Sequence, residues 1–124
     1  MGEHLTEVGA FDETINILLG TDASVLPICV SMKGLRTHLI KHKHFDCLRH
    51  LADLSDIISS PDYVGVSPNE ANTSFEYVKK FDKNIQIGIK LEESGDYFYV
   101  ASMYSITDSK VRRRLYSGRL KNFS

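Results

Sequence analysis

The hydrophobic period of the sequence changes at Pro61, and this change limits the folds open to the chain. Before Pro61, apolar residues recur at helical spacing, whereas after it they alternate with polar residues as in β-strands. The clearest alternation runs from Ile85 to Leu91, where four aliphatic residues are each separated by one polar residue or glycine. Helices first and strands later indicate an α+β fold, with the helices packed on one face of an antiparallel sheet.

The segment before Pro61 is expected to form three helices. They span Val8 to Gly20, Gly34 to Lys43 and Phe45 to Ser59, with a short strand or extended link between Val25 and Met32. Ser31 is expected to cap the second helix, because a serine side chain accepts hydrogen bonds from free N–H groups at a helix start. Pro61 is expected to end the third, because the residue before a proline avoids the helical region.

After Pro61 the pattern predicts four strands joined by three turns, which is a four-stranded antiparallel meander. The strands are expected at Tyr63–Val66, Phe75–Lys80, Ile85–Leu91 and Tyr97–Tyr104, and the turns at 67–72, 81–84 and 92–96. Strict alternation would place Phe98, Val100, Ser102 and Tyr104 on one face of the last strand.

The length of 124 residues predicts a single domain over residues 1–124. Residues 1–7 are expected to be frayed, and the basic tail 108–124 to pack back on the body through Tyr116, Leu120 and Phe123. No apolar run approaches the 18 residues of a membrane helix, so no membrane association is expected. The N-terminus lacks the basic start of a signal peptide, and we expect a cytoplasmic protein with two reduced cysteines, Cys29 and Cys47.

A net charge of −1 conceals an uneven distribution. Residues 1–30 carry five acidic side chains and no lysine or arginine, whereas residues 31–50 carry five cations and only Asp46 as an acid. The tail from Asp108 carries six further cations. Two basic blocks in a nearly neutral chain indicate a surface that binds an anion.

Four of the five histidines lie between Lys33 and His50. His38 and His42 are four residues apart and would share nearly one helix face, where an imidazole can accept or donate a proton near neutral pH. Zinc binding is an alternative, but the HxxxHxHxxC spacing matches no metal motif closely, and no HExxH is present. The other alternative is that these histidines are structural side chains satisfied by hydrogen bonds.

The candidate phosphate contacts are cations and one hydroxyl. They are Lys41, Arg112, Arg113, Arg119 and Thr107. Charge runs are usually solvated, and three consecutive arginines cannot all lie on one face, so at most two of Arg112, Arg113 and Arg114 would contact one ligand. Ser102 and Tyr104 would place hydroxyls near the end of the last strand, although both are also compatible with simple packing. No GxSxG, Walker or GxGxxG motif is present, and no cofactor is expected.

The order VLPICVSMKGLRTHLIKHKH, LADLSDIISSPDYV and YVASMYSIT resembles the phage-associated branch of the barnase/EndoU/colicin/RelE-like (BECR-fold) nuclease superfamily. The resemblance covers roughly Val25 to Thr107. It implies a small α+β, metal-independent endoribonuclease of bacterial or phage origin, often a toxin or effector paired with an inhibitor protein. It also implies that His38 is the helix histidine of the site and that Ser102 and Tyr104 are its late-strand hydroxyl residues.

The chemistry implied by this resemblance is attack of the ribose 2′-OH on the adjacent phosphorus, which gives a 2′,3′-cyclic phosphate. The partner would be RNA, with tRNA as one candidate, and delivery into a target cell as part of a larger effector is an alternative setting. A non-catalytic RNA-binding or protein-interaction module is the main alternative function. A metal-dependent hydrolase is a third.

Overall fold

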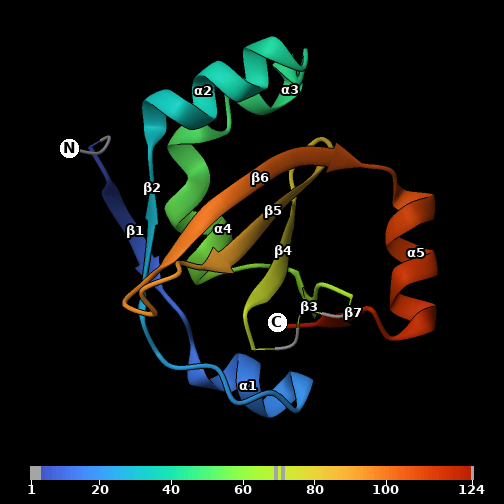
Figure 1. The fold of residues 1–124 in the computed structure, drawn as a ribbon. Helices are drawn as coiled ribbons and strands as arrows, with labels where there is room; N and C mark the ends of the chain where they lie inside the picture. The colour runs from blue at the N-terminus through green and yellow to red at the C-terminus, as the bar shows by residue number, and fades with distance from the viewer. Residues whose placement is uncertain (1–3, 69, 71, 124) are drawn as a thin grey trace.

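The computed structural model describes residues 4–68, 70 and 72–123 and shows an α+β fold (Figure 1). Its helices are α1 (Glu13–Leu19), α2 (Met32–Lys41), α3 (Phe45–Leu48), α4 (Leu54–Ser59) and α5 (Asp108–Ser117), with a 3₁₀ turn, η1, at Leu51–Asp53. Its strands are β1 (Thr6–Ala10), β2 (Pro27–Val30), β3 (Tyr63–Val66), β4 (Ser74–Lys80), β5 (Asn84–Leu91), β6 (Phe98–Ile106) and β7 (Leu120–Asn122).

The described strands form one seven-stranded mixed sheet in the order β1-β2-β6-β5-β4-β3-β7. The predicted antiparallel meander is present as its middle, β3 to β6. The expectation of only four antiparallel strands is wrong, because β2 joins β6 in parallel, β1 extends that edge and β7 pairs with β3 at the other. These added pairings join segments far apart in sequence, which local periodicity does not report.

The expected helix from Val8 to Gly20 is also wrong in its first half. Residues 6–10 form β1, paired with β2, and the helix starts only at Glu13. Asp12 fixes this start, because its side chain accepts a hydrogen bond from the N–H of Thr14 at 2.8 Å. Residues 1–7 were expected to be frayed, but Thr6 and Glu7 belong to the sheet. Residues 1–3 lie outside the described residues.

The second predicted helix is confirmed as α2, and its Ser31 cap is confirmed, because Ser31 Oγ accepts from the N–H of Gly34 at 3.1 Å. The third is broken into α3, η1 and α4 near His50. At this break the His50 ring stacks on Phe81, in the β4–β5 connection, with 4.2 Å between the ring centroids. The helical segment ends at Ser59, before Pro61, as predicted.

The main hydrophobic core lies between one face of the sheet and helices α1, α2 and α4. Its centre is the β5 row Ile85, Ile87 and Ile89, each fully buried. A smaller cluster lies on the opposite face, where Val111 and Leu115 of α5 pack against that side of the sheet. Figure 1 shows α2 and α3 together at one end of the sheet and α5 beyond the far end of β6.

An irregularity in β6 changes the face of the sheet that its second half presents. Gly88 pairs with Ser102 but Ile89 pairs with Val100, so Ala101 is an extra residue in the strand. The expectation that Phe98, Val100, Ser102 and Tyr104 share a face is therefore wrong. Phe98 and Val100 are buried in the main core, whereas Ser102 and Tyr104 lie on the opposite face.

Candidate active site

The sheet face opposite the main core carries a row of polar side chains, which we call the polar face. Residues paired directly across antiparallel strands point to the same side of a sheet. The pairings Glu76–Gly88–Ser102 and Val78–Gln86–Tyr104 therefore place Glu76, Gln86, Ser102 and Tyr104 on this face. Glu76 and Gln86 are 5% and 1% exposed, so they are buried polar groups that need partners.

A connected set of hydrogen bonds supplies these partners. Arg119 donates to both carboxylate oxygens of Glu76, from Nε at 3.0 Å and from Nη2 at 2.7 Å. Gln86 Nε2 lies 3.3 Å from Glu76 Oε2 and 2.6 Å from the Tyr104 hydroxyl oxygen. Arg114, on α5, donates to Gln86 Oε1 at 2.6 Å. The polar network therefore contains Glu76, Gln86, Tyr104, Arg114 and Arg119, contributed by three strands, α5 and the α5–β7 turn.

Arg114 fixes the orientation of the Gln86 amide. Because the guanidinium can only donate, the oxygen of that amide must face it, and the NH₂ group must face Glu76 and Tyr104. The Tyr104 oxygen thus accepts a hydrogen bond, and its own proton is left to donate to another group. Glu76 raises the pKa of Arg119 through the paired hydrogen bonds, so the guanidinium stays fully charged.

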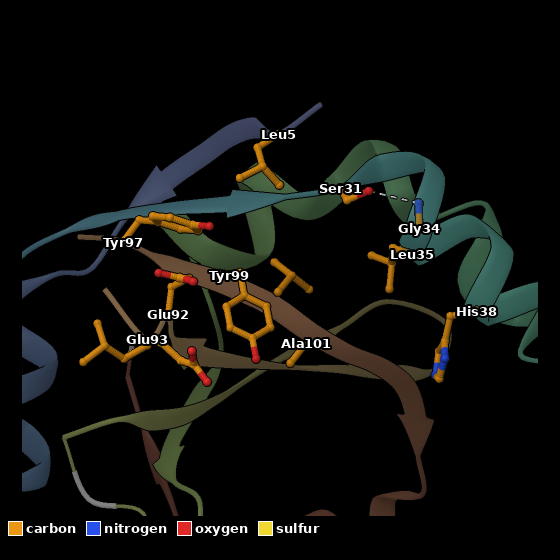
Figure 2. Close-up of a pocket in the computed structure, with 12 residues that line it drawn as sticks. Leu5, Ser31, Gly34, Leu35, His38, Glu92, Glu93, Tyr97, Tyr99 and Ala101 are labelled. Carbon is orange, nitrogen blue, oxygen red and sulfur yellow. Dashed lines mark hydrogen bonds between the residues drawn. The ribbon is translucent and has the colours of Figure 1, made fainter. Parts of the chain in front are cut away.

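His38, on α2, lies beside β6. It lines a cavity together with Ala101, the residue immediately before Ser102, as Figure 2 shows. Its ring lies 4.4 Å from that of His42, centroid to centroid. Both imidazoles are exposed. The predicted residues His38, Ser102 and Tyr104 are therefore distributed along one strand, with the helix histidine at one end and the polar network at the other.

The pKa of His42 is lowered from its usual value. Partial desolvation is the largest cause, and the charges of His38, Lys41 and His44 lower it further. A lowered pKa keeps more of this imidazole neutral near pH 6, which is the form that accepts a proton.

The other predicted phosphate contacts lie outside the polar network. Thr107 caps α5, because its hydroxyl accepts from the N–H of Lys110 at 3.1 Å. Arg112 and Arg113 are exposed on α5, and Lys41 is exposed at the end of α2. Among the predicted cations only Arg119 belongs to the network.

Sequence reasoning missed Glu76, Gln86 and Arg114 as site residues. Alternation in β4 and β5 was a usable signal, since it placed Glu76 and Gln86 opposite the aromatic and isoleucine rows. Their partners Arg119 and Arg114 are 43 and 28 residues away, so spacing gave no sign of the contacts.

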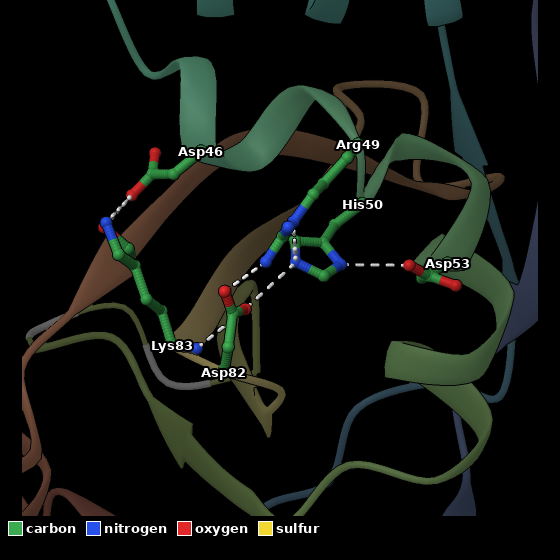
Figure 3. A network of polar contacts seen from close by, with 7 residues as sticks. Asp46, Arg49, His50, Asp53, Asp82 and Lys83 are labelled. Atoms are coloured by element: carbon green, nitrogen blue, oxygen red, sulfur yellow. Dashed lines mark hydrogen bonds and ion pairs between the residues drawn. The ribbon is translucent and has the colours of Figure 1, made fainter.

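A second charged cluster lies beneath α3 and ties it to the β4–β5 connection (Figure 3). Asp82 pairs with Arg49, and His50 Nδ1 lies 3.0 Å from Asp53 Oδ2. Asp46 accepts from the Ser105 hydroxyl at 2.7 Å, and this bond is the largest cause that lowers the pKa of Asp46. His50 is only 7% exposed, so this imidazole has a structural role in the fold.

The described residues contain no group of three or more His, Cys, Asp or Glu side chains arranged to hold a metal ion. In the same part of the chain, no helix has the length and apolarity to cross a membrane.

A family model described as phage-Barnase-EndoU-ColicinE5/D-RelE like nuclease 3 matches residues 6–113. The match covers every strand from β1 to β6, and it ends within α5, before Arg114 and Arg119. Comparison with curated proteins and with solved structures finds no significant match.

Proposed function

The chain belongs to the phage-Barnase-EndoU-ColicinE5/D-RelE like nuclease family, and from this we propose that it is an endoribonuclease with its active site on the polar face. The observation that carries the proposal is the polar network around Tyr104. It presents a tyrosine hydroxyl with a free proton beside two guanidinium groups, on a sheet face next to an exposed histidine. Guanidinium groups bind phosphate oxygens by paired, charge-assisted hydrogen bonds.

The reaction proposed is attack of the ribose 2′-oxygen on the adjacent phosphorus. His38 takes the proton from the 2′-OH. His42, whose ring centroid lies 4.4 Å from that of His38, is the alternative proton acceptor. The new O2′–P bond forms as the P–O5′ bond breaks, and Tyr104 donates its proton to the leaving 5′-oxygen. The products are a 2′,3′-cyclic phosphate and a 5′-hydroxyl, and no metal ion takes part.

The cations have distinct roles in this proposal. Arg119 and Arg114 bind the phosphate and stabilise the charge that develops on its oxygens. Glu76 and Gln86 act as positioning residues, because they hold Arg119 and Tyr104 in place. Ser102 donates a further hydrogen bond to the phosphate. Lys41, Arg112 and Arg113 attract the RNA from their exposed positions without contacting the reacting group, and Thr107 contributes only as the α5 cap.

The decisive experiment incubates total RNA with the purified protein in a chelator, beside His38→Ala, and analyses the ends of any fragments. We expect cyclic-phosphate fragments from the parent, a rate about 10²–10⁴-fold lower for His38→Ala, and intact single-stranded DNA. DNA is resistant in this mechanism because it lacks the 2′-OH. Cleavage of DNA, or full activity of His38→Ala, would contradict it.

A matched pair on α5 tests the phosphate contact. Arg114→Ala should lower activity by at least about tenfold, because Arg114 is bound into the network, whereas Arg113→Ala should weaken RNA binding only slightly. If RNA is bound and shifted on gels but never cut, the chain is instead a non-catalytic RNA-binding module. A tRNA substrate, an inhibitor partner and a toxin or effector role are parts of the proposal that rest on the family resemblance alone. The proposed cytoplasmic setting rests on the expectation of two reduced cysteines.

A further inference from the structure

A cavity of about 520 Å³ lies between the start of α2, the β5–β6 turn and β6. Its polar lining includes Ser31, His38, Glu92, Glu93, Tyr97 and Tyr99. Figure 2 shows the carboxylates of Glu92 and Glu93 to one side of the Tyr99 ring and His38 to the other. The volume lies within the range of sites that bind small organic groups.

The cavity opens on the same sheet face as the polar network. Tyr99 pairs with Lys90, so its side chain shares the polar face with Ser102 and Tyr104. Tyr99 and Ser102 face Lys90 and Gly88, which are two residues apart on β5, so they are separated by roughly 7 Å along the strand, at a rise of about 3.3 Å per residue. An RNA strand with its phosphate at Ser102 and Tyr104 can therefore reach this cavity with a neighbouring base.

The carboxylates in the cavity lining repel a phosphate group and favour a ligand that donates hydrogen bonds. The Glu92 side chain accepts a hydrogen bond from the N–H of Ser94 at 2.7 Å, and the bonds from Ser94 lower the pKa of Glu92. An ionised carboxylate has only acceptor atoms, and it repels the RNA backbone. The tyrosine rings offer apolar faces on which a base can stack, as single-stranded RNA bases do on aromatic side chains.

We infer that this cavity is a base-recognition site that prefers guanine in the RNA strand. Guanine is the base whose pairing edge presents two adjacent donors, N1–H and N2–H, which match the two oxygens of one carboxylate. Uracil presents one donor between two acceptors, and the acceptors would face carboxylate oxygens. The inference rests on the proposed function for its RNA substrate, but the binding it describes can be measured without cleavage.

The test is a titration of the protein with each of the four ribonucleoside monophosphates, followed by backbone NMR. We expect GMP to shift the signals of Glu92, Tyr97 and Tyr99, and to bind about tenfold or more tightly than UMP. Glu92→Gln with Glu93→Gln should remove that preference. Asp56→Asn, an exposed carboxylate on α4, is the control and should bind GMP as the parent does.

Two further variants separate base stacking from loss of folding. Tyr99→Phe keeps the ring and should retain GMP binding, whereas Tyr99→Ser should lose about tenfold or more. Equal affinity for all four nucleotides, or shifts confined to Arg114 and Arg119, would overturn the inference. Binding of GMP in the cavity with RNA left intact would support it and count against the nuclease proposal. Cleavage of RNA with no base preference would support the nuclease proposal and contradict the base-recognition site.

Discussion

Arg119 contacts both oxygens of the Glu76 carboxylate, at 3.0 and 2.7 Å, yet the two side chains are unequally exposed. The Arg119 side chain is 32% exposed and that of Glu76 is 6%. An arginine that loses its partner here can turn towards water, whereas the carboxylate cannot. The pair is therefore asymmetric, and its two halves should respond differently to substitution.

Arg119→Ala should lower the free energy of unfolding by about 2–3 kcal/mol, because it leaves a buried carboxylate without its cation. Glu76→Gln should cost only about 1 kcal/mol, since the amide still accepts hydrogen bonds and Arg119 still reaches solvent. Urea unfolding of both variants measures the difference. Equal losses would show that the exposed fraction of each partner does not control the cost.

Tyr104→Phe should lower RNA cleavage by about 10²-fold while leaving the fold intact. The substitution removes the proton that Tyr104 is proposed to donate, and Gln86 keeps its contacts with Glu76 and Arg114. Tyr116→Phe is the matched control, because Tyr116 is 96% exposed on α5 and should retain full activity. An unchanged rate for Tyr104→Phe would remove this residue from the mechanism.

The His42 imidazole should titrate below its ordinary pKa of 6.5, as seen in a proton NMR titration. In His38→Ala the midpoint should move upwards, because one neighbouring charge that opposes protonation is gone. Since the folded pKa is the lower one, the contribution of His42 to stability is present above pH 6.5 and declines as the pH falls towards the folded value. A midpoint at or above 6.5 in the parent would contradict this environment.

The Cys47 thiol should resist alkylation at pH 8 until the protein unfolds. Burial raises its pKa to about 12, and the nearby Asp46 charge contributes in the same direction, so almost no thiolate forms. Iodoacetamide labelling across a urea series, in a Cys29→Ser background, should follow the global unfolding curve. Labelling well before unfolding would mean that α3 opens locally.

Much of the fold follows from local sequence chemistry. The isoleucines of β5 alternate over a full strand, and Ser31 supplies a cap, so both elements were predicted with nearly correct bounds. β1 and β7 were missed because each is short and acquires its structure by pairing with a distant strand. Local pattern contains no information about such partners.

The candidate site was less accessible to sequence reasoning. Histidines stand out by residue type, so the sequence itself indicates His38 and His42 as candidates. The resemblance to the nuclease superfamily then implies His38, Ser102 and Tyr104 as site residues. Glu76 and Gln86 look like ordinary outward-facing strand residues, and only the folded chain brings Arg119 and Arg114 to them. Arg112 and Arg113 are equally prominent in the sequence, but the helical turn directs them into solvent.

The extra residue at Ala101 has a consequence for how this chain tolerates insertions and deletions. Removing Ala101 itself would leave a regular strand in which Met103 stays in the core and Tyr104 stays on the polar face, because Val100 and Ser102 already face neighbouring residues of β5. If Ala101 were kept but paired with Gly88, Met103 would turn out to water and Tyr104 would enter the isoleucine layer, on the opposite side of the sheet from the guanidinium groups. The site therefore depends on the register of β6 beyond Ala101, and not on the number of residues in the strand.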